Sequence, residues 1–205
     1  MKIYTFNSKV LTRNSKWLKE HGEPTPPTPS LPPYTIRMRF FDEVTPSFSN
    51  GTLTQVSSSP NVWDLTYENS DWDRLCINQY NLAEVIDANT TGVTDMSYAF
   101  MNCGSLASVP LFDTSAVINM DYMFNYCSSL TSVPLFNTSN VTSMEYMFRG
   151  CNNVQSGALA LYQQASTQAT PPNYHENTFL NCGSNTVTGA AELAQIPSDW
   201  GGTAS

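Results

Sequence analysis

The sequence predicts an α/β repeat fold: a leucine-rich-repeat-like solenoid with a small antiparallel β cap at its start and a helical C-terminal cap. The main observation is a 24-residue repeat in Thr91–Thr114, Ser115–Thr138 and Ser139–Tyr162. Apolar residues recur at fixed positions in these copies: Val93, Val117 and Val141; Met96, Met120 and Met144; Phe100, Phe124 and Phe148; Cys103, Cys127 and Cys151. Such self-similarity is typical of solenoids, in which each unit buries its apolar face against its neighbours.

Two segments of distinct composition open the chain. Residues 1–21 contain very short β-like runs separated by turn residues, and we expect a β-hairpin-like anchor there. Residues 22–33 hold six of the thirteen prolines. This composition predicts an extended, semi-rigid linker that marks a domain boundary.

Residues 34–67 are expected to form the β cap. The run Tyr34–Phe41 alternates between apolar residues and Arg37 and Arg39, as in a half-buried strand. Thr52–Ser57 and Val62–Tyr67 are further strand candidates. We expect these strands to pair into a small antiparallel sheet that covers the first repeat.

Residues 68–162 are expected to form the solenoid, with Glu68–Thr90 as a degenerate first unit. In each full repeat the Met, Phe and Cys positions follow helical spacing, which predicts helices near Met96–Cys103, Met120–Cys127 and Met144–Cys151. A short strand should follow each helix, with Val109 and Leu111 on one face in the first copy.

The ends of the repeat region carry their own signals. Asn69 or Ser70 is the predicted N-cap of a helix, so Asp71 and Asp73 are interpreted as capping rather than catalytic residues. Residues 163–205 are expected to form the C-terminal cap. Helical stretches are predicted at Gly157–Ser166 and Thr188–Gln195.

Charge is low and unevenly distributed. Charged residues make up 13% of the chain, about half the usual share, which favours an extracellular or virion surface. Residues 1–22 carry five basic and one acidic side chain, a net charge of +4, so the total of −8 leaves −12 for the remainder. This acidic balance argues against nucleic acid as a partner.

The five cysteines are expected to be mostly buried, because three of them recur once per repeat. The alternative to free, buried thiols is a disulfide among the outer cysteines, which include Cys76 and Cys182. A zinc site is not expected, since no Cys-x-x-Cys pair exists and only His21 and His175 are available. We expect no metal and no cofactor.

Neither membrane insertion nor catalysis is expected. Lys2, Lys9, Arg13 and Lys16 interrupt every early apolar run, so no secretory signal is visible, and no stretch of about 20 apolar residues occurs. The known hydrolase, phosphate-loop and metalloprotease motifs are missing from the sequence. We therefore expect a protein that is not an enzyme and has no catalytic residues.

Two aromatic stripes form the candidate ligand face. Tyr98, Tyr122 and Tyr146 lie two residues after each repeat Met and should form an exposed ladder. Their rings either pack along the repeat or offer a stacking platform for sugar or protein. Phe112 and Phe136 are a second candidate stripe, with half-burial at strand ends as the alternative.

The N-terminal segment is too apolar for a free tail, because disordered segments contain few aromatic residues. We expect it to dock on an acidic surface. The residues of this predicted assembly interface are Ile3, Tyr4, Phe6, Lys9, Val10, Leu11, Arg13, Lys16 and Trp17.

The repeat pattern V-x-x-M-x-x-M-F-x-x-C-x-x-L-x-x-V-P-L-F-[DN]-T-S resembles the BspA-like, Mycoplasma-type surface-protein repeat, over about Leu65–Leu161. Ala99 replaces the second Met of the first copy, and the third copy lacks Val-Pro-Leu-Phe. The resemblance implies a leucine-rich-repeat-like fold and surface binding or adhesion, with no catalytic residue. The opening MKIYTFNSKVLTRNSKWL is similar to the starts of structural proteins of gut phages.

We therefore expect a non-enzymatic virion structural protein, either a phage head fibre or decoration protein or a tail fibre. Its N-terminus would bind other virion proteins of the capsid or tail, and its repeats would bind a host-surface glycan or protein. A homotrimer on the virion surface is expected. The alternative is a BspA-like adhesin on a bacterial cell surface.

Overall fold

The computed structural model describes residues 4–6, 9–11, 31–41, 45–48, 50–58 and 60–204. The chain divides into two compact units, Met1–Ser30 and Leu31–Ser205. In the first unit, strand β1 (Tyr4–Phe6) pairs antiparallel with β2 (Lys9–Leu11), with Tyr4 opposite Leu11. Of the predicted anchor residues, Ile3, Arg13, Lys16 and Trp17 lie outside the described residues. For Tyr4, Phe6, Lys9, Val10 and Leu11 only the backbone is described.

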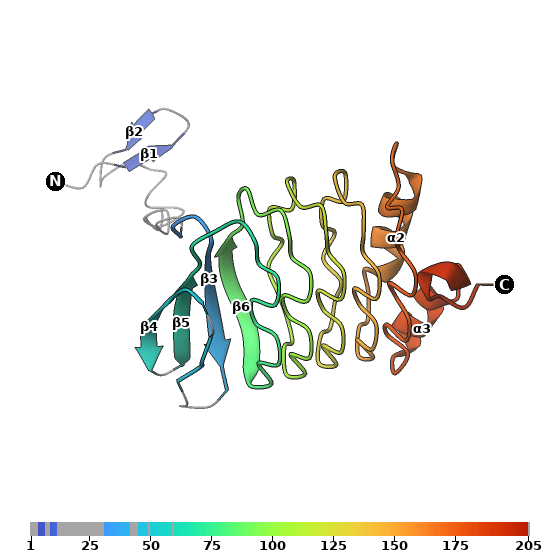
Figure 1. The fold of residues 1–205 in the computed structure, drawn as a ribbon, viewed down its shortest axis with the longest axis horizontal. Coiled ribbons are helices and arrows are strands. Elements are labelled where there is room, and N and C mark those ends of the chain that lie inside the picture. The colour runs from blue at the N-terminus through green and yellow to red at the C-terminus, as the bar shows by residue number, and fades with distance from the viewer. Residues whose placement is uncertain are drawn as a thin grey trace. The chain divides into compact units, whose positions relative to one another are not determined.

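The second unit begins with an open, antiparallel four-stranded sheet (Figure 1). Its strands are β3 (Thr35–Phe40), β4 (Thr52–Ser58), β5 (Asn61–Thr66) and β6 (Leu82–Asn89), in the order β4-β5-β3-β6. Three of these strands lie on the expected segments. The fourth, β6, comes from the degenerate first repeat, so the sheet extends beyond the boundary predicted at residue 67.

The sheet follows from the alternation in β3. Ile36, Met38 and Phe40 are buried on one face. On the other face Arg37 donates through Nε and Nη2 to the two carboxylate oxygens of Asp64 in β5, each at 2.7 Å. Arg39 donates through Nε at 3.0 Å and Nη2 at 2.7 Å to Glu84 Oε2 in β6. These oppositely charged side chains lie directly across from each other in the register, and such cross-strand pairs favour that register.

The predicted leucine-rich-repeat-like α/β solenoid is wrong. The regular elements of the described part of unit two are the open antiparallel sheet, helices α2 (Ala158–Thr167) and α3 (Val187–Leu193), and a 3₁₀ turn at Ser198–Trp200. No helix forms at Met96–Cys103, Met120–Cys127 or Met144–Cys151, and none starts at Asn69 or Ser70; the chain makes turns there. The strand predicted through Val109 and Leu111 is also missing.

Left-handed residues explain why the repeat helices do not form. Tyr98, Tyr122 and Tyr146 have φ of 57°, 56° and 56°, and an L-residue in this region cannot continue a right-handed helix. The amide hydrogen bonds also alternate. The amide of Ala99 bonds within its own segment, to Met96 O at 3.2 Å, whereas that of Tyr98 bonds to Asp121 O of the next segment at 2.8 Å.

Successive repeat segments consequently lie side by side in register (Figure 1). Isolated parallel bridges join Asp71 to Asp95, Asp95 to Asn119, and Asn119 to Ser143. Because residues 24 positions apart lie next to each other in neighbouring segments, side chains at equivalent repeat positions form columns. The fourth bridge, Ser143 to Tyr174, shows that the C-terminal region predicted as a separate cap supplies one more segment.

The core consists of these columns. Phe100, Phe124, Phe148 and Phe179 stack at centroid distances of 5.3, 5.3 and 6.0 Å, and all four are fully buried. The cysteines form a parallel column, and all five are buried and free, so the alternative of a disulfide is wrong. Thiols of Cys103, Cys127 and Cys151 donate to carbonyls of the preceding segment at 3.0–3.1 Å.

The C-terminal helices lie close to their predicted positions. Helix α2 is an insertion between the third segment and the last one, and its Leu161 and Ala165 are fully buried. Thr186 caps α3 by accepting from Gly189 N at 3.0 Å. Trp200, which is 5% exposed, stacks on His175 at 4.2 Å and closes this end of the core.

Candidate binding surfaces

A column of half-buried tyrosines, Tyr98, Tyr122 and Tyr146, runs along the repeat segments; we call it the tyrosine row. The ring centroids are 4.9 Å apart at both steps, and the planes differ by 4° and 21°. Burial, followed by its neighbours Tyr98 and Tyr146 and two carboxylates, raises the pKa of Tyr122. The three tyrosines thus form a stacked column, but the rings are half-buried and not exposed as predicted.

The faces of these rings are largely covered. Inside the row each ring faces the next one. The guanidinium of Arg74 lies 4.7 Å from the centroid of Tyr98, and that of Arg149 lies 5.5 Å from Tyr146 and 5.4 Å from Tyr126. Of the two interpretations, the geometry agrees with packing along the repeat, so a partner of the row would meet ring edges and hydroxyl groups rather than an open aromatic face.

The second aromatic stripe is not on the surface. Phe112 is 3% exposed and Phe136 is 0% exposed, and the two rings stack at 5.7 Å within the core. Their placement on the candidate ligand face was wrong. Without a strand at this position, the phenylalanine turns inward and the preceding leucine turns outward: Leu111 is 66% exposed and Leu135 is 51% exposed.

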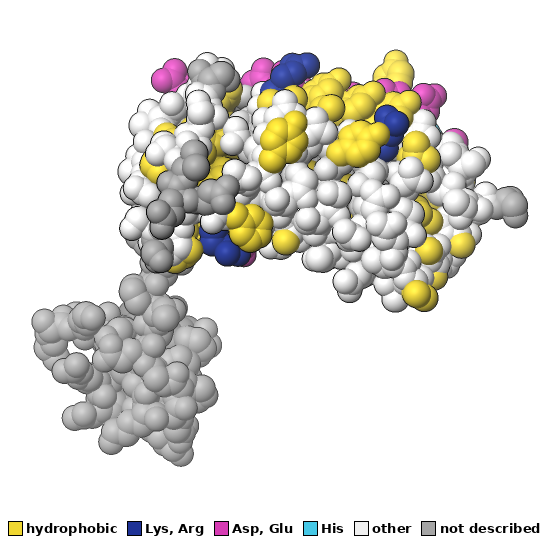
Figure 2. Space-filling model, turned by 90° about the horizontal axis from the view of Figure 1, so that it is seen from below, with side chains coloured by type: hydrophobic (Ala, Val, Ile, Leu, Met, Phe, Trp, Pro, Cys, Tyr) yellow, Lys and Arg dark blue, Asp and Glu magenta, His cyan; other side chains and the backbone are white. Residues whose placement is uncertain are grey.

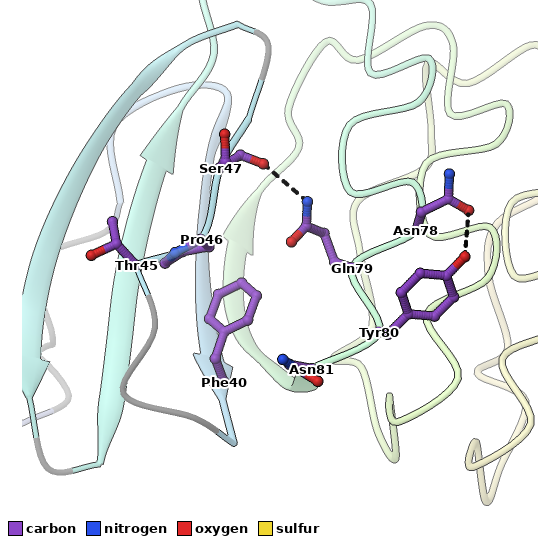
Figure 3. A pocket seen from close by; sticks show the side chains of 8 residues that line it. All are labelled: Phe40, Thr45, Pro46, Ser47, Asn78, Gln79, Tyr80 and Asn81. Atoms are coloured by element: carbon purple, nitrogen blue, oxygen red, sulfur yellow. Dashed lines mark hydrogen bonds between the residues drawn. The ribbon is translucent and has the colours of Figure 1, made fainter.

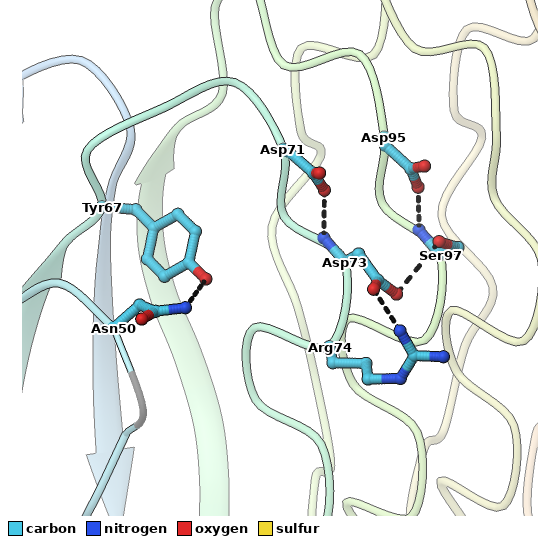
Figure 4. Close-up of polar contacts among 7 residues, drawn as sticks. All are labelled: Asn50, Tyr67, Asp71, Asp73, Arg74, Asp95 and Ser97. Carbon is cyan, nitrogen blue, oxygen red and sulfur yellow. Dashed lines mark hydrogen bonds and ion pairs between the residues drawn. The ribbon is translucent and has the colours of Figure 1, made fainter.

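Carboxylates line the turns that precede the tyrosine row. Asp71 accepts from the backbone of Asp73 at 2.9 Å, and Asp95 accepts from that of Ser97 at 2.7 Å (Figure 4). Asp73 also forms an ion pair with Arg74 and accepts from Ser97 Oγ at 3.2 Å. The predicted helix N-terminus is therefore wrong: Asp71 holds a turn rather than the first turn of a helix.

Acidic side chains also lie close together in the later repeat segments. Burial, together with the charges of Asp121 and Glu176, raises the pKa of Glu145. Asp121 itself accepts from Ser143 Oγ at 2.5 Å and from Glu145 N at 2.8 Å, so its carboxylate serves local structure. In the part of the chain that the structure describes, no three His, Cys, Asp or Glu side chains are grouped to hold a metal ion.

Figure 2 shows hydrophobic side chains gathered along one long edge of the unit, with basic side chains among them and acidic ones beside them. Several large apolar side chains are exposed on the unit as a whole, among them Tyr80 at 62%, Tyr126 at 46% and Tyr174 at 61%. Tyr80 was not singled out from the sequence, because it aligns with Gly104, Ser128 and Asn152, a position at which the repeat has no fixed residue.

A shallow pocket of about 320 Å³ lies where the end of β3 meets the first repeat segment (Figure 3). Its lining is Phe40, Thr45, Pro46, Ser47, Asn78, Gln79, Tyr80 and Asn81. Gln79 Nε2 donates to Ser47 O at 3.0 Å, which holds the two walls together. Sequence reasoning missed this site because the walls come from distant segments that carry no recognisable motif.

A second hollow lies beside the edge of the sheet and is lined by Asn50, Gly51, Tyr67, Glu68 and Asn69. Asn50 Nδ2 donates to the Tyr67 hydroxyl at 3.1 Å across it (Figure 4). Gly51 has φ of 94°, and a Cβ there would lie 2.7 Å from Thr66 O, so the hollow depends on glycine.

These features define a repeat-segment protein with a side-by-side stack of turns, a regular tyrosine row and a neutral surface pocket. The family described as "Mycoplasma protein of unknown function, DUF285" matches residues 70–178, just over half of the chain. The chain belongs to this family. No curated protein and no solved structure matched the chain. Among the described residues, no helix is both long and apolar enough to cross a membrane.

Proposed function

We propose that this chain is a non-enzymatic binding protein that displays its repeat segments on the surface of a phage virion, as a head fibre, decoration protein or tail fibre. The observation that carries the binding role is the tyrosine row. Three half-buried rings repeat at 4.9 Å, and Asp121 and Glu145 lie close enough to the middle ring to affect its pKa. A regular column of identical groups is a surface that a repetitive host polymer or protein can follow.

The contacts of the row favour a polar partner. Because ring faces pack on each other and on Arg74, the hydroxyls and ring edges are the groups left for a partner. Stacking also holds the rings rigid, so little side-chain entropy is lost on binding. Tyrosine is enriched at binding surfaces for this combination of contact area and a polar tip.

Attachment to the virion is assigned to residues 1–21, with residues 22–33 as a spacer. This assignment is supported by sequence: the segment carries five of the nine basic residues together with several aromatic ones. The basic segment suits an acidic site on a capsid or tail protein. We propose a homotrimer as the displayed form.

The test combines location with binding. Mass spectrometry of purified virions should detect the protein in stoichiometric amounts, and its absence from particles would reject the virion role. For binding, the triple variant Tyr98→Phe, Tyr122→Phe and Tyr146→Phe removes the hydroxyls but keeps the stack. Labelled variant protein should attach to host cells more weakly than wild type at an unchanged melting temperature. Equal attachment would remove the row from the proposal.

A second candidate function is a bacterial cell-surface adhesin. The family description favours it, because it names a cellular organism, Mycoplasma. Fractionation separates the two candidates. An adhesin would be recovered with cell envelopes of uninfected bacteria, whereas a virion protein would appear only after infection and sediment with particles.

A further inference from the structure

We propose that the pocket between the end of β3 and the first repeat segment binds one unit of a neutral saccharide. This inference deepens the proposed function, since it names the class of surface polymer that the protein would recognise. It rests on residues that are separate from the tyrosine row (Figure 3).

The lining chemistry is the first argument. All eight lining residues are uncharged: three carry hydroxyl groups, three carry amides, and the others are Phe40 and Pro46. Amides and hydroxyls both donate and accept, which is the property needed to pair with sugar hydroxyls. A charged ligand would find no counter-charge on these eight residues, so desolvation of its charge would be uncompensated.

The exposed ring of Tyr80 is the second argument. Its side chain is 62% exposed, and within the described part of the chain no other ring stacks on it. It therefore differs from the tyrosine row, whose rings cover one another. An open aromatic face beside hydrogen-bonding groups suits the apolar C–H face of a pyranose ring, while the polar groups take its hydroxyls.

The amides are already positioned, which is the third argument. Asn78 Oδ1 accepts from Asn102 Nδ2 at 2.8 Å and from the Tyr80 hydroxyl at 3.5 Å. Among the described residues nothing accepts from Asn78 Nδ2, so that group remains a donor for a ligand. Asn78 has a φ of 62°, a conformation that asparagine tolerates better than most residues.

Gln79 is held in a similar way. Its Nε2 donates to Ser47 O, and its Oε1 has no partner in the parts of the chain that the structure describes. The site thus offers one fixed donor, one fixed acceptor and an aromatic face around about 320 Å³, the lower end of the roughly 300–1,000 Å³ that small-molecule sites occupy. That size suits a single sugar unit.

Saturation-transfer NMR on the full chain tests the proposal, with glucose, galactose, mannose and N-acetylglucosamine as neutral probes and glucuronate as a charged one, each at millimolar concentration. We expect saturation transfer to at least one neutral sugar and none to glucuronate. The proposal is overturned if no neutral sugar receives saturation, or if glucuronate binds more strongly than the neutral probes.

Three variants locate the site. Tyr80→Ala should weaken binding by at least about tenfold, the loss typical of a central aromatic contact. Asn78→Asp keeps the acceptor used by Asn102 but removes the free donor, and should also weaken binding. Tyr174→Ala is the matched control, because Tyr174 is 61% exposed and lies outside the pocket, and it should bind as wild type.

Unchanged binding in Tyr80→Ala or Asn78→Asp would place the sugar elsewhere and overturn the proposal. Circular dichroism of each variant separates lost binding from lost folding. Sugar binding by a protein that is missing from virions would reject the virion role and keep the pocket. A protein that is found in virions but binds no sugar would keep the virion role and reject the pocket as a saccharide site.

Discussion

Phe124 occupies the middle of the buried aromatic column. Its ring lies 5.3 Å from both Phe100 and Phe148 and 6.0 Å from Phe136, and its side chain is fully buried. A residue with aromatic neighbours on several sides leaves a cavity when truncated, because the surrounding segments are held in place by their own hydrogen bonds.

We predict that Phe124→Ala lowers the free energy of unfolding by about 3–5 kcal/mol, measured by urea denaturation. Leu111→Ala provides the control: this side chain is 66% exposed and should change stability little. A Phe124→Ala protein that unfolds at the wild-type urea concentration would show that the column is not essential to the core.

The cysteine column gives a prediction on pH. Burial raises the pKa of Cys103 from an ordinary value of 9.0 to about 12, and it raises the pKa values of Cys76, Cys127 and Cys182 as well. Between these two values the unfolded chain loses thiol protons that the folded chain retains. The unfolded state then binds fewer protons, so stability must fall as pH rises.

We therefore expect the contribution of the thiols to the free energy of unfolding to be constant below about pH 8. Above the ordinary thiol pKa of 9.0 this contribution should fall progressively as the pH approaches 12. Denaturation midpoints across this range provide the measurement. Cys103→Ser or Cys103→Ala should make the decline shallower. A thiol reagent at pH 8 should label none of the five cysteines in the native protein; rapid labelling would mean that the column is open to solvent.

At the scale of the element, each repeat segment is organised by two left-handed positions. The first is the tyrosine of the row, and the second is Asn102, Tyr126 or Gly150, with φ of 61°, 59° and 75°. At these points the backbone reverses its helical sense, and alternate amides turn toward the neighbouring segment. The side-by-side arrangement of segments therefore depends on residues that adopt positive φ.

Gly150→Ala tests this dependence. An added Cβ would lie 2.6 Å from Tyr126 Cδ1, and the left-handed backbone by itself costs a non-glycine residue about 1–2 kcal/mol. We expect a loss of at least about 1 kcal/mol in the free energy of unfolding. Gly104→Ala is the control, since its nearest contact would be Ser128 Oγ at 3.7 Å, an ordinary distance. Equal stability of the two variants would contradict the assignment of strain to Gly150.

At the scale of the whole molecule, the basic segment and the acidic remainder fall largely into different units. Unit one carries the basic segment, and unit two begins at Leu31. Leu31 is 7% exposed and its carbonyl accepts from Asn89 Nδ2 at 2.8 Å, so it belongs to the folded body although the linker was predicted to end at residue 33. The body contains the complete sheet and all repeat segments.

A variant that lacks residues 1–30 is expected to fold and to melt at the temperature of the intact chain, as judged by calorimetry. Under the proposed function it should nevertheless fail to join virions when supplied during infection. Incorporation equal to that of the intact protein would show that the N-terminal segment is not the anchor. A large drop in melting temperature would show that this segment also stabilises the body.

The sequence by itself determined that the recurring Met, Phe and Cys positions are buried, and the interval at which they recur. The Phe, Met and Cys positions of every repeat lie in the core, and three strands and two C-terminal helices fall near their predicted positions. These features follow from local patterns: period-two alternation in β3, and apolar residues at a fixed 24-residue interval. A repeated apolar position must be buried against its neighbour whatever the backbone does between repeats.

Only the tertiary structure decided how the backbone runs between those positions. Spacing of i, i+4 and i+7 suits a helix, but the same residues point inward when amides such as that of Tyr98 bond to the next segment instead of their own. The inward turn of Phe112 and the covered ring faces of the tyrosine row follow from these hydrogen bonds between segments. The neutral pocket likewise exists only because β3 and the first repeat segment meet in space, and no local pattern encodes a contact between residues so far apart in the chain.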